Sequence, residues 1–126
     1  MEKLKNKVVL IVDDEDRNAF ALSNYLEASE INTVIARHGE EAIEALRGNA
    51  TIDIVLLDMM MPVMDGYETL SVLQKDESLK NIPVIAVTAR AMKGDKEKCL
   101  ESGAWDYVSK PIDLALLLDK IAKLIA

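Results

Sequence analysis

Short apolar runs alternate along the chain with stretches in which apolar residues recur every three or four positions. The first run, Val8–Val12, contains only apolar, mostly β-branched residues and stops at Asp13. Such runs are typical of strands that are buried on both faces of a parallel sheet. On this pattern we expect five strands, at residues 8–12, 33–36, 54–57, 84–87 and 107–108.

Segments with helical spacing separate the expected strands. Ala19, Leu22 and Leu26 recur at a near-helical period with polar residues between them, and Asp16 stands where an N-cap is expected. A second periodic segment is closed by Gly48, a residue typical of helix ends. The other helices are expected around residues 70–73, from about 93 to 101 and from 114 to 125.

Five strands that alternate with five helices predict an α/β fold with a doubly wound parallel sheet, because each parallel crossover needs a helix to return the chain. No repeat or linker interrupts the pattern, so we expect residues 1–126 to form a single domain. In open sheets of this kind, ligands bind beyond the carboxyl ends of the strands. The residues at those ends therefore indicate the function.

Composition narrows the classes of function. The 126 residues include 15 Lys and Arg and 22 Asp and Glu, a net charge of −7, which argues against direct binding of nucleic acid. One cysteine, Cys99, and one histidine, His38, exclude an intrachain disulfide and a Cys/His zinc cluster, so any metal must be held by oxygen. No apolar stretch has the length of a membrane span, and we expect a cytoplasmic protein without membrane contact.

Acidic, hydroxyl and basic residues follow the expected strands. Asp13 and Asp14 come after the first strand, Asp58 after the third, Thr88 after the fourth and Lys110 after the fifth. If the first and third strands are neighbours, three carboxylates converge, and a hard cation such as Mg²⁺ relieves their repulsion. A carboxylate can attack phosphorus, so Asp58 is the candidate nucleophile, with Lys110 and Thr88 stabilising the transferred charge.

The chain resembles the receiver domains of two-component response regulators in four segments. These are VDDE at 12–15, LDMMMPVMDG at 57–66, VTA at 87–89 and YVSKP at 107–111. The resemblance spans nearly the whole chain, in order, and implies a flavodoxin-like fold with strand order 2-1-3-4-5. It also implies a phosphorylatable signalling switch that catalyses only its own phosphorylation and dephosphorylation.

The resemblance implies a set of metal ligands around the phosphoacceptor. Asp58 accepts the phosphoryl group, and Asp14 binds Mg²⁺ directly. Asp13 acts mainly through water, and the backbone carbonyl of Met60 supplies a further ligand. The Met60 side chain has no polar group to guide a water molecule, so we predict that dephosphorylation is not unusually fast.

The resemblance also implies how the switch works. Thr88 and Lys110 contact the phosphoryl group, and Tyr107 turns inward as the Thr88 hydroxyl moves, a shift between two packings. An aromatic residue in a short strand is more often a packing residue, and this alternative for Tyr107 stays open. In the family the bond between Lys110 and Pro111 is usually cis, and the sequence permits either isomer.

The partners implied are a histidine kinase or a histidine phosphotransfer protein as phosphodonor, and a downstream protein target. Residues 91–99 are most similar to receivers of hybrid sensor histidine kinases, so the chain is either a stand-alone receiver or one excised from a longer protein. The resemblance leaves two oligomeric states open, a monomer and a phosphorylation-dependent dimer.

Two other functions stay open. A Mg²⁺-dependent small-molecule phosphohydrolase also uses an Asp nucleophile at a strand end, but it usually carries a second acid two residues later, where this chain has Met60. An interaction module that has lost phosphorylation is disfavoured, because every expected site residue is present.

Several conspicuous residues have structural explanations. Met59, Met61 and Met64 are expected to fill gaps in the packing. Cys99 is expected to be half-buried on a helix, and His38 to lie at the surface.

Overall fold

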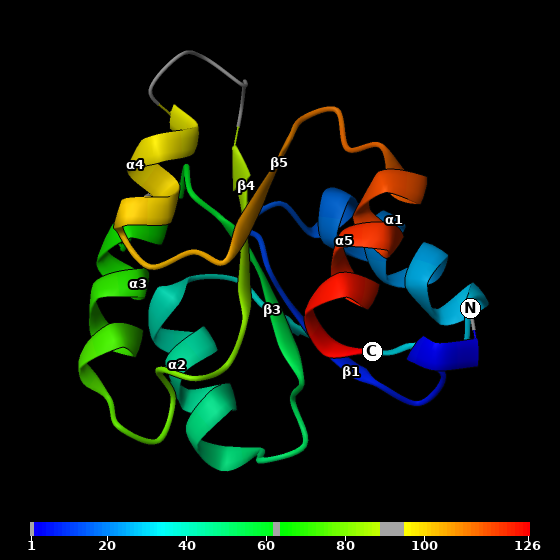
Figure 1. Ribbon diagram of the computed structural model, residues 1–126, viewed down its shortest axis with the longest axis horizontal. Helices are drawn as coiled ribbons and strands as arrows, with labels where there is room; N and C mark the ends of the chain where they lie inside the picture. Colours follow the sequence, from blue (N-terminus) through cyan, green and yellow to red (C-terminus); the bar gives the residue numbers. More distant parts are fainter. Residues whose placement is uncertain (1, 62–63, 89–94) are drawn as a thin grey trace.

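The computed structural model describes residues 2–61, 64–88 and 95–126, and its centre is a five-stranded sheet (Figure 1). All neighbouring strands are parallel, in the order β2-β1-β3-β4-β5, which confirms the expected fold class and strand order. The strands are β1 (Val8–Val12), β2 (Asn32–Ala36), β3 (Ile54–Asp58), β4 (Val84–Thr88) and β5 (Asp106–Ser109).

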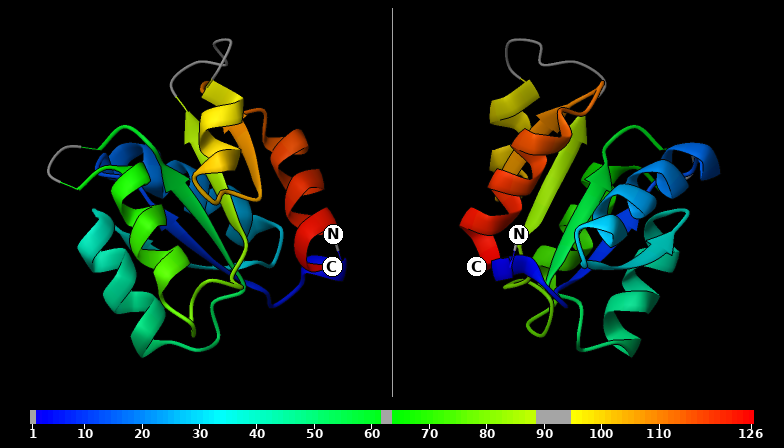
Figure 2. Two further views of the ribbon diagram at one scale, coloured as in Figure 1. Left: turned by 60° about the vertical axis from the view of Figure 1, so that its left-hand side comes forward. Right: turned by 90° about the vertical axis from the view of Figure 1, so that its right-hand side faces the viewer.

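Helices cover both faces of the sheet. Figures 1 and 2 show α1 and α5 on one face and α2, α3 and α4 on the other. The helices are α1 (Asp16–Ala28), α2 (Gly39–Gly48), α3 (Gly66–Lys75), α4 (Asp95–Glu101) and α5 (Leu114–Ile125), and a short 3₁₀ turn, η1 (Glu2–Leu4), precedes β1. None of the described helices has the length and apolar character that crossing a bilayer requires.

Each central strand contributes to two cores, one under each layer of helices. In β3, Val55 and Leu57 pack beneath α2 and α3, whereas Ile54 and Leu56 pack beneath α1 and α5. All four side chains are buried, which explains why the strand is apolar without alternation. Burial of one such side chain contributes about 1.5–3 kcal/mol, so the strand that ends at Asp58 is firmly held.

Side-chain caps define where most helices begin. His38 accepts a hydrogen bond from Glu41 N–H at α2, and Asp65 accepts one from Glu68 N–H at α3. Asp113 caps α5 in the same way. His38 is exposed, as the sequence predicted, but its capping role was not expected.

The expected cap at α1 was wrong. Asp16 lies in the first turn of the helix and pairs with Arg37 at 3.3 Å, and Glu15 is at the N-cap without a side-chain cap. The helix therefore begins one residue earlier than expected, directly after the turn in which Asp13 accepts a hydrogen bond from Glu15 N–H at 2.9 Å.

Sulfur-containing side chains lie mainly in the core. Met59 and Met61 are buried and Met64 packs against the same cluster, which confirms their packing role. Cys99 is fully buried rather than half-buried, because it faces α3 and lies 3.7 Å from the hydroxyl of Tyr67. The resemblance of residues 91–99 to hybrid-kinase receivers rests partly on residues outside the described ranges.

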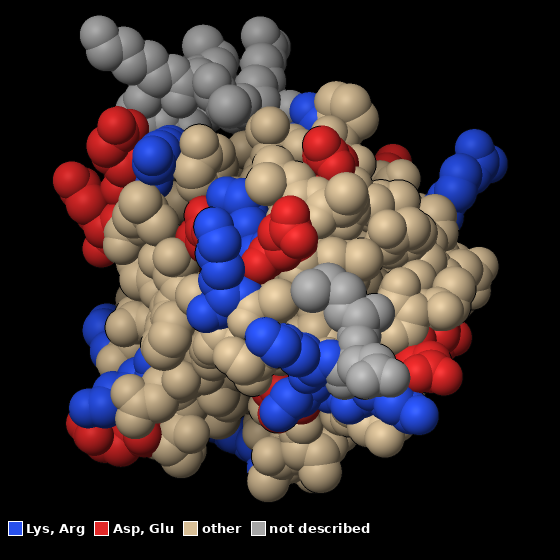
Figure 3. Space-filling model, turned by 45° about the vertical axis from the view of Figure 1, so that its right-hand side comes forward, with Lys and Arg blue, Asp and Glu red and all other residues tan. Residues whose placement is uncertain are grey.

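The face that carries β5 and α5 has interspersed charges. In Figure 3 basic and acidic side chains lie among one another on this face, without a broad area of one sign. The net charge of −7 is therefore not concentrated there.

Candidate functional site

The carboxyl ends of β1 and β3 bring three carboxylates together. These strands are neighbours, with Val12 paired to Leu57, so Asp13 and Asp14 enter the loop beside Asp58. One oxygen from each carboxylate lies within 4.8 Å of the other two. Asp13 and Asp58 are buried and Asp14 is exposed. The convergence expected from the strand order is therefore present.

Both oxygens of the Asp58 carboxylate have partners. Oδ1 accepts a hydrogen bond from Met60 N–H at 3.0 Å, and Oδ2 lies 3.4 Å from the Lys110 ammonium. The Asp58 side chain is only 5% exposed, whereas that of Lys110 is 34% exposed. The carboxylate is thus held in one orientation, with its cationic partner near the surface.

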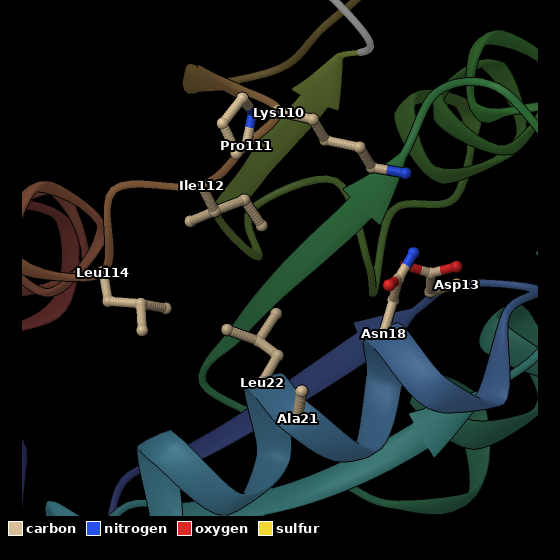
Figure 4. Close-up of a pocket in the computed structure, with 8 residues that line it drawn as sticks. All are labelled: Asp13, Asn18, Ala21, Leu22, Lys110, Pro111, Ile112 and Leu114. Atoms are coloured by element: carbon tan, nitrogen blue, oxygen red, sulfur yellow. The ribbon is translucent and has the colours of Figure 1, made fainter.

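Lys110 reaches Asp58 from the far side of β4. Its backbone N–H donates to the carbonyl of Thr88 at 2.8 Å, which fixes the start of the β5–α5 loop to the end of β4. The peptide bond between Lys110 and Pro111 is cis. Figure 4 shows the lysine side chain extending from this loop toward Asp13.

Burial raises the pKa of Asp13. The negative charges of Asp58 and Asp14 act in the same direction, because they disfavour a further carboxylate. The hydrogen bond from Glu15 N–H and the charge of Lys110 lower the pKa and only partly offset these effects. Ionisation of Asp13 therefore has a cost that a nearby cation would remove.

The site fits Mg²⁺ on charge and on ligand type. Among the residues that the structure describes, three carboxylates face one ammonium, which leaves two uncompensated negative charges in a partly buried cluster. Asp13, Asp14 and Asp58 offer only oxygen, the ligand that Mg²⁺ prefers. Met60 N–H already bonds to Asp58, which places the Met60 peptide at the same cluster. The chain's own residues thus suit a hard divalent cation.

Thr88 and Tyr107 lie on the adjacent strands β4 and β5. Thr88 is the last residue of β4 and is buried, and its hydroxyl donates a hydrogen bond to the carbonyl of Val108 on β5 at 3.4 Å. Tyr107, the residue before Val108, is partly buried at the edge of the sheet. The end of β4 is thereby connected to the strand that carries the tyrosine.

A groove of about 360 Å³ opens beside the carboxylates, between α1 and the β5–α5 loop (Figure 4). One end is polar and the other is apolar, with the lining residues Asp13, Asn18, Lys110, Ala21, Leu22, Pro111, Ile112 and Leu114. Sequence reasoning did not find this groove. Nothing in a single sequence indicates which exposed side of α1 faces the loop after β5.

Comparisons with known proteins agree with this fold. The family model described as "Response regulator receiver domain" matches residues 9–122. The polar-differentiation response regulator DivK of Brucella ovis is 40% identical over 115 residues, which cover 91% of this chain and 93% of DivK.

Solved receiver structures are also similar. The receiver domain of the Francisella response regulator 1452 superposes with a TM-score of 0.87 at 33% identity, covering 94% of this chain and 96% of that domain. The receiver domain of Saccharomyces cerevisiae Ssk1, solved in complex with the histidine phosphotransfer protein Ypd1, has a TM-score of 0.86 at 28% identity, covering 96% of this chain and 90% of that chain.

A doubly wound parallel sheet with an acidic cluster at its carboxyl edge defines a flavodoxin-like α/β protein. Within that class, the chain belongs to the response regulator receiver domain family. It is a receiver domain, a module of two-component signal transduction, and this confirms the family predicted from the four sequence segments. The specific likeness to hybrid-kinase receivers stays a prediction.

Proposed function

We propose that Asp58 accepts a phosphoryl group from the phosphohistidine of a histidine kinase or histidine phosphotransfer protein. The transfer breaks the phosphorus–nitrogen bond of the donor and forms a phosphorus–oxygen bond at Asp58. The bonding electrons return to the imidazole ring. The observation that supports this role is the geometry of Asp58, a buried carboxylate beside two other carboxylates and 3.4 Å from Lys110.

Asp13, Asp14, Asp58 and the carbonyl of Met60 would hold Mg²⁺, with Asp13 acting mainly through water. When bound, the cation supplies positive charge that offsets the repulsion between the carboxylates and the incoming phosphoryl oxygens. Asp58 keeps its orientation through Met60 N–H and Lys110, with one of its oxygens within 4.8 Å of an oxygen of Asp13 and of Asp14. No second acid stands two residues after Asp58, which disfavours turnover of small phosphate esters.

Lys110 and Thr88 would bind the transferred group. The Lys110 ammonium is close enough to Asp58 to follow a phosphoryl oxygen with a small side-chain movement. The Thr88 hydroxyl would leave the Val108 carbonyl and donate to the phosphoryl group instead. Loss of that contact to β5 favours a second packing of Tyr107, and this switched state would be recognised by the downstream protein target.

The groove beside the site would receive the phosphodonor protein. Its polar end contains Asp13, Asn18 and Lys110, and its apolar end suits the apolar side of a helix that carries a phosphohistidine. The Ssk1 receiver, which this chain resembles, was solved with a histidine phosphotransfer protein, and this supports the same class of partner here. We further propose that residues 1–126 act as one domain in the cytoplasm, as a monomer or a phosphorylation-dependent dimer.

The test is chemical. The protein is incubated with acetyl phosphate and Mg²⁺, and its intact mass is measured. We expect the gain of one phosphoryl group, lost on chelation of Mg²⁺ and in Asp58→Ala. Asp119→Ala, at an exposed position on α5, is the matched control and should be phosphorylated normally. Phosphorylation of Asp58→Ala, or rapid turnover of a small phosphate ester, would contradict the proposal.

A further inference from the structure

The ring of Tyr107 lies between lysines from two helices. Figure 2 shows β5, the edge strand of the sheet, between α4 and α5. The Lys120 ammonium of α5 is 4.9 Å from the centroid of the Tyr107 ring, and the Lys96 ammonium of α4 is 5.7 Å from it. Both distances are within the range of an attractive cation–π contact.

An ion pair holds one of these lysines in place. Asp106 Oδ1 accepts a hydrogen bond from the Lys120 ammonium at 2.9 Å and another from Tyr107 N–H at 2.8 Å. The side chains of Lys120 and Asp106 are only 19% and 30% exposed, so solvent screens this arrangement weakly. Asp106 thus connects the lysine to the backbone of the residue whose ring the lysine covers.

In this structure the ring position occurs together with a hydrogen bond between Thr88 and β5. The Thr88 hydroxyl donates to the Val108 carbonyl, one residue after Tyr107, so the hydroxyl is engaged on the same strand as the ring. A turn of the ring away from the strand edge would separate it from Lys120 and Lys96. Both cation–π contacts would then be lost together.

We propose that Lys96 and Lys120 form a cation–π clamp on Tyr107 that, with the Asp106–Lys120 ion pair, restrains the switch. The clamp favours the ring position of this structure and lowers the fraction of molecules in the switched state. The inference rests on the proposed function, because Tyr107 must be the residue that moves. It adds a restraint supplied by side chains of α4 and α5, outside the acidic site.

The size of the restraint follows from the exposure of each contact. A cation–π contact near the surface is worth a factor of about two to five in an equilibrium constant. Removing the contact raises the equilibrium constant for the switched state by this factor. A ligand or covalent group that favours the switched state then binds or forms more readily by the same factor. Each lysine substitution should therefore raise the rate of phosphorylation by a small donor about two- to fivefold.

The experiment compares Lys120→Met, Lys96→Met and Lys123→Met by their rates of phosphorylation with phosphoramidate and Mg²⁺. Lys123 lies on α5 like Lys120 and is exposed, and no contact of it with a described aromatic ring is found. All three changes remove one positive charge, which weakens attraction of an anionic donor. A rate increase is therefore opposite in sign to the effect of charge alone.

A second readout follows the ring itself. The chain has three tyrosines, so fluorotyrosine labelling gives three ¹⁹F signals, and Tyr107→Phe assigns the one from position 107. In the two clamp variants this signal should move toward its position in the phosphorylated wild type, without any phosphodonor present. It should not move in Lys123→Met.

The clamp is supported if both variants are faster than Lys123→Met and if Lys120→Met has no effect in a Tyr107→Leu background. It is overturned if Lys120→Met and Lys96→Met match Lys123→Met, or if the increase persists without the ring. Failure of the wild type to be phosphorylated would instead contradict the proposed function. In that case, displacement of the Tyr107 ¹⁹F signal from its unmodified wild-type position in Lys120→Met and Lys96→Met, but not in Lys123→Met, still decides whether the lysines hold the ring.

Discussion

At the scale of single residues, the Asp58 carboxylate is held in one orientation beside two other carboxylates. Its two oxygens are bonded to Met60 N–H and to the Lys110 ammonium, while an oxygen from each of two further carboxylates lies within 4.8 Å of it. The lysine competes with a metal ion for the same negative charge but would also bind a transferred phosphoryl group. Removal of the Lys110 ammonium should therefore strengthen metal binding and slow phosphorylation.

We predict that Lys110→Ala binds Mg²⁺ several-fold more tightly and is phosphorylated by acetyl phosphate at least about tenfold more slowly. The first effect arises because a competing positive charge is gone, and the second because one charge-assisted hydrogen bond worth about 1.5–3 kcal/mol is lost. Calorimetric titration with Mg²⁺ and time-resolved intact-mass measurements give the two values. Lys123→Ala is the control, and a parallel loss of Mg²⁺ affinity in Lys110→Ala would contradict this account.

At the scale of elements, the groove depends on where α1 and the β5–α5 loop begin. Asp13 accepts a hydrogen bond from Glu15 N–H just before α1, and Asp113 caps α5 three residues after Lys110. Between them, the exposed Ala21 and the partly buried Ile112 line the groove. A small residue on α1 leaves this surface open.

Filling the groove should block a protein donor without affecting a small one. We predict that Ala21→Trp slows phosphotransfer from a histidine phosphotransfer protein at least about tenfold, since a misplaced bulky side chain at the centre of an interface costs more than 1.4 kcal/mol. Phosphorylation by acetyl phosphate should stay within twofold of wild type. Ala28→Trp makes the same change at an exposed position near the end of α1, outside the groove. Equal effects of the two variants would show that the groove is not the docking site.

At the scale of the whole molecule, the acidic cluster lowers the stability of the folded protein, although the same carboxylates form the candidate metal site. The folded-state pKa of Asp13 is raised above its unfolded value. The folded form therefore binds this proton more tightly than the unfolded form does. It follows that the contribution of Asp13 to stability is most favourable below the unfolded pKa and declines as the pH rises through the folded pKa.

We predict that Asp13→Asn raises the free energy of unfolding at pH 7 in buffer without Mg²⁺, because a neutral amide oxygen can still accept from Glu15 N–H. The advantage over wild type should vanish below the usual pKa of aspartate, where the carboxyl is protonated in both states. Mg²⁺ should stabilise the wild type in urea unfolding and stabilise the variant much less. An advantage that grows as the pH falls would contradict the sign of this effect.

How far the site could be predicted from the chain differs from residue to residue. Asp58 and Asp13 stand directly after apolar runs, with Asp14 next to Asp13, and parallel strands align such positions at one edge, so their meeting could be predicted. Cys99 was misjudged because its spacing on a short helix does not reveal how deeply that helix packs. The N-cap of α1 was misplaced by one residue, because Asp16 pairs with Arg37 instead of capping and the cap position falls on Glu15, whose side chain makes no capping bond.

Local patterns predict how strands and helices alternate along the chain, because strands buried on two faces require continuous apolar runs. The same patterns place the carboxylates and the lysine at the strand ends. Only the folded arrangement decides which side chains meet across unconnected elements. The groove needs α1 beside the β5–α5 loop, and the Tyr107 ring needs lysines from both α4 and α5. Such contacts depend on helix orientation and side-chain reach, which the packing of the complete core determines and no local pattern encodes.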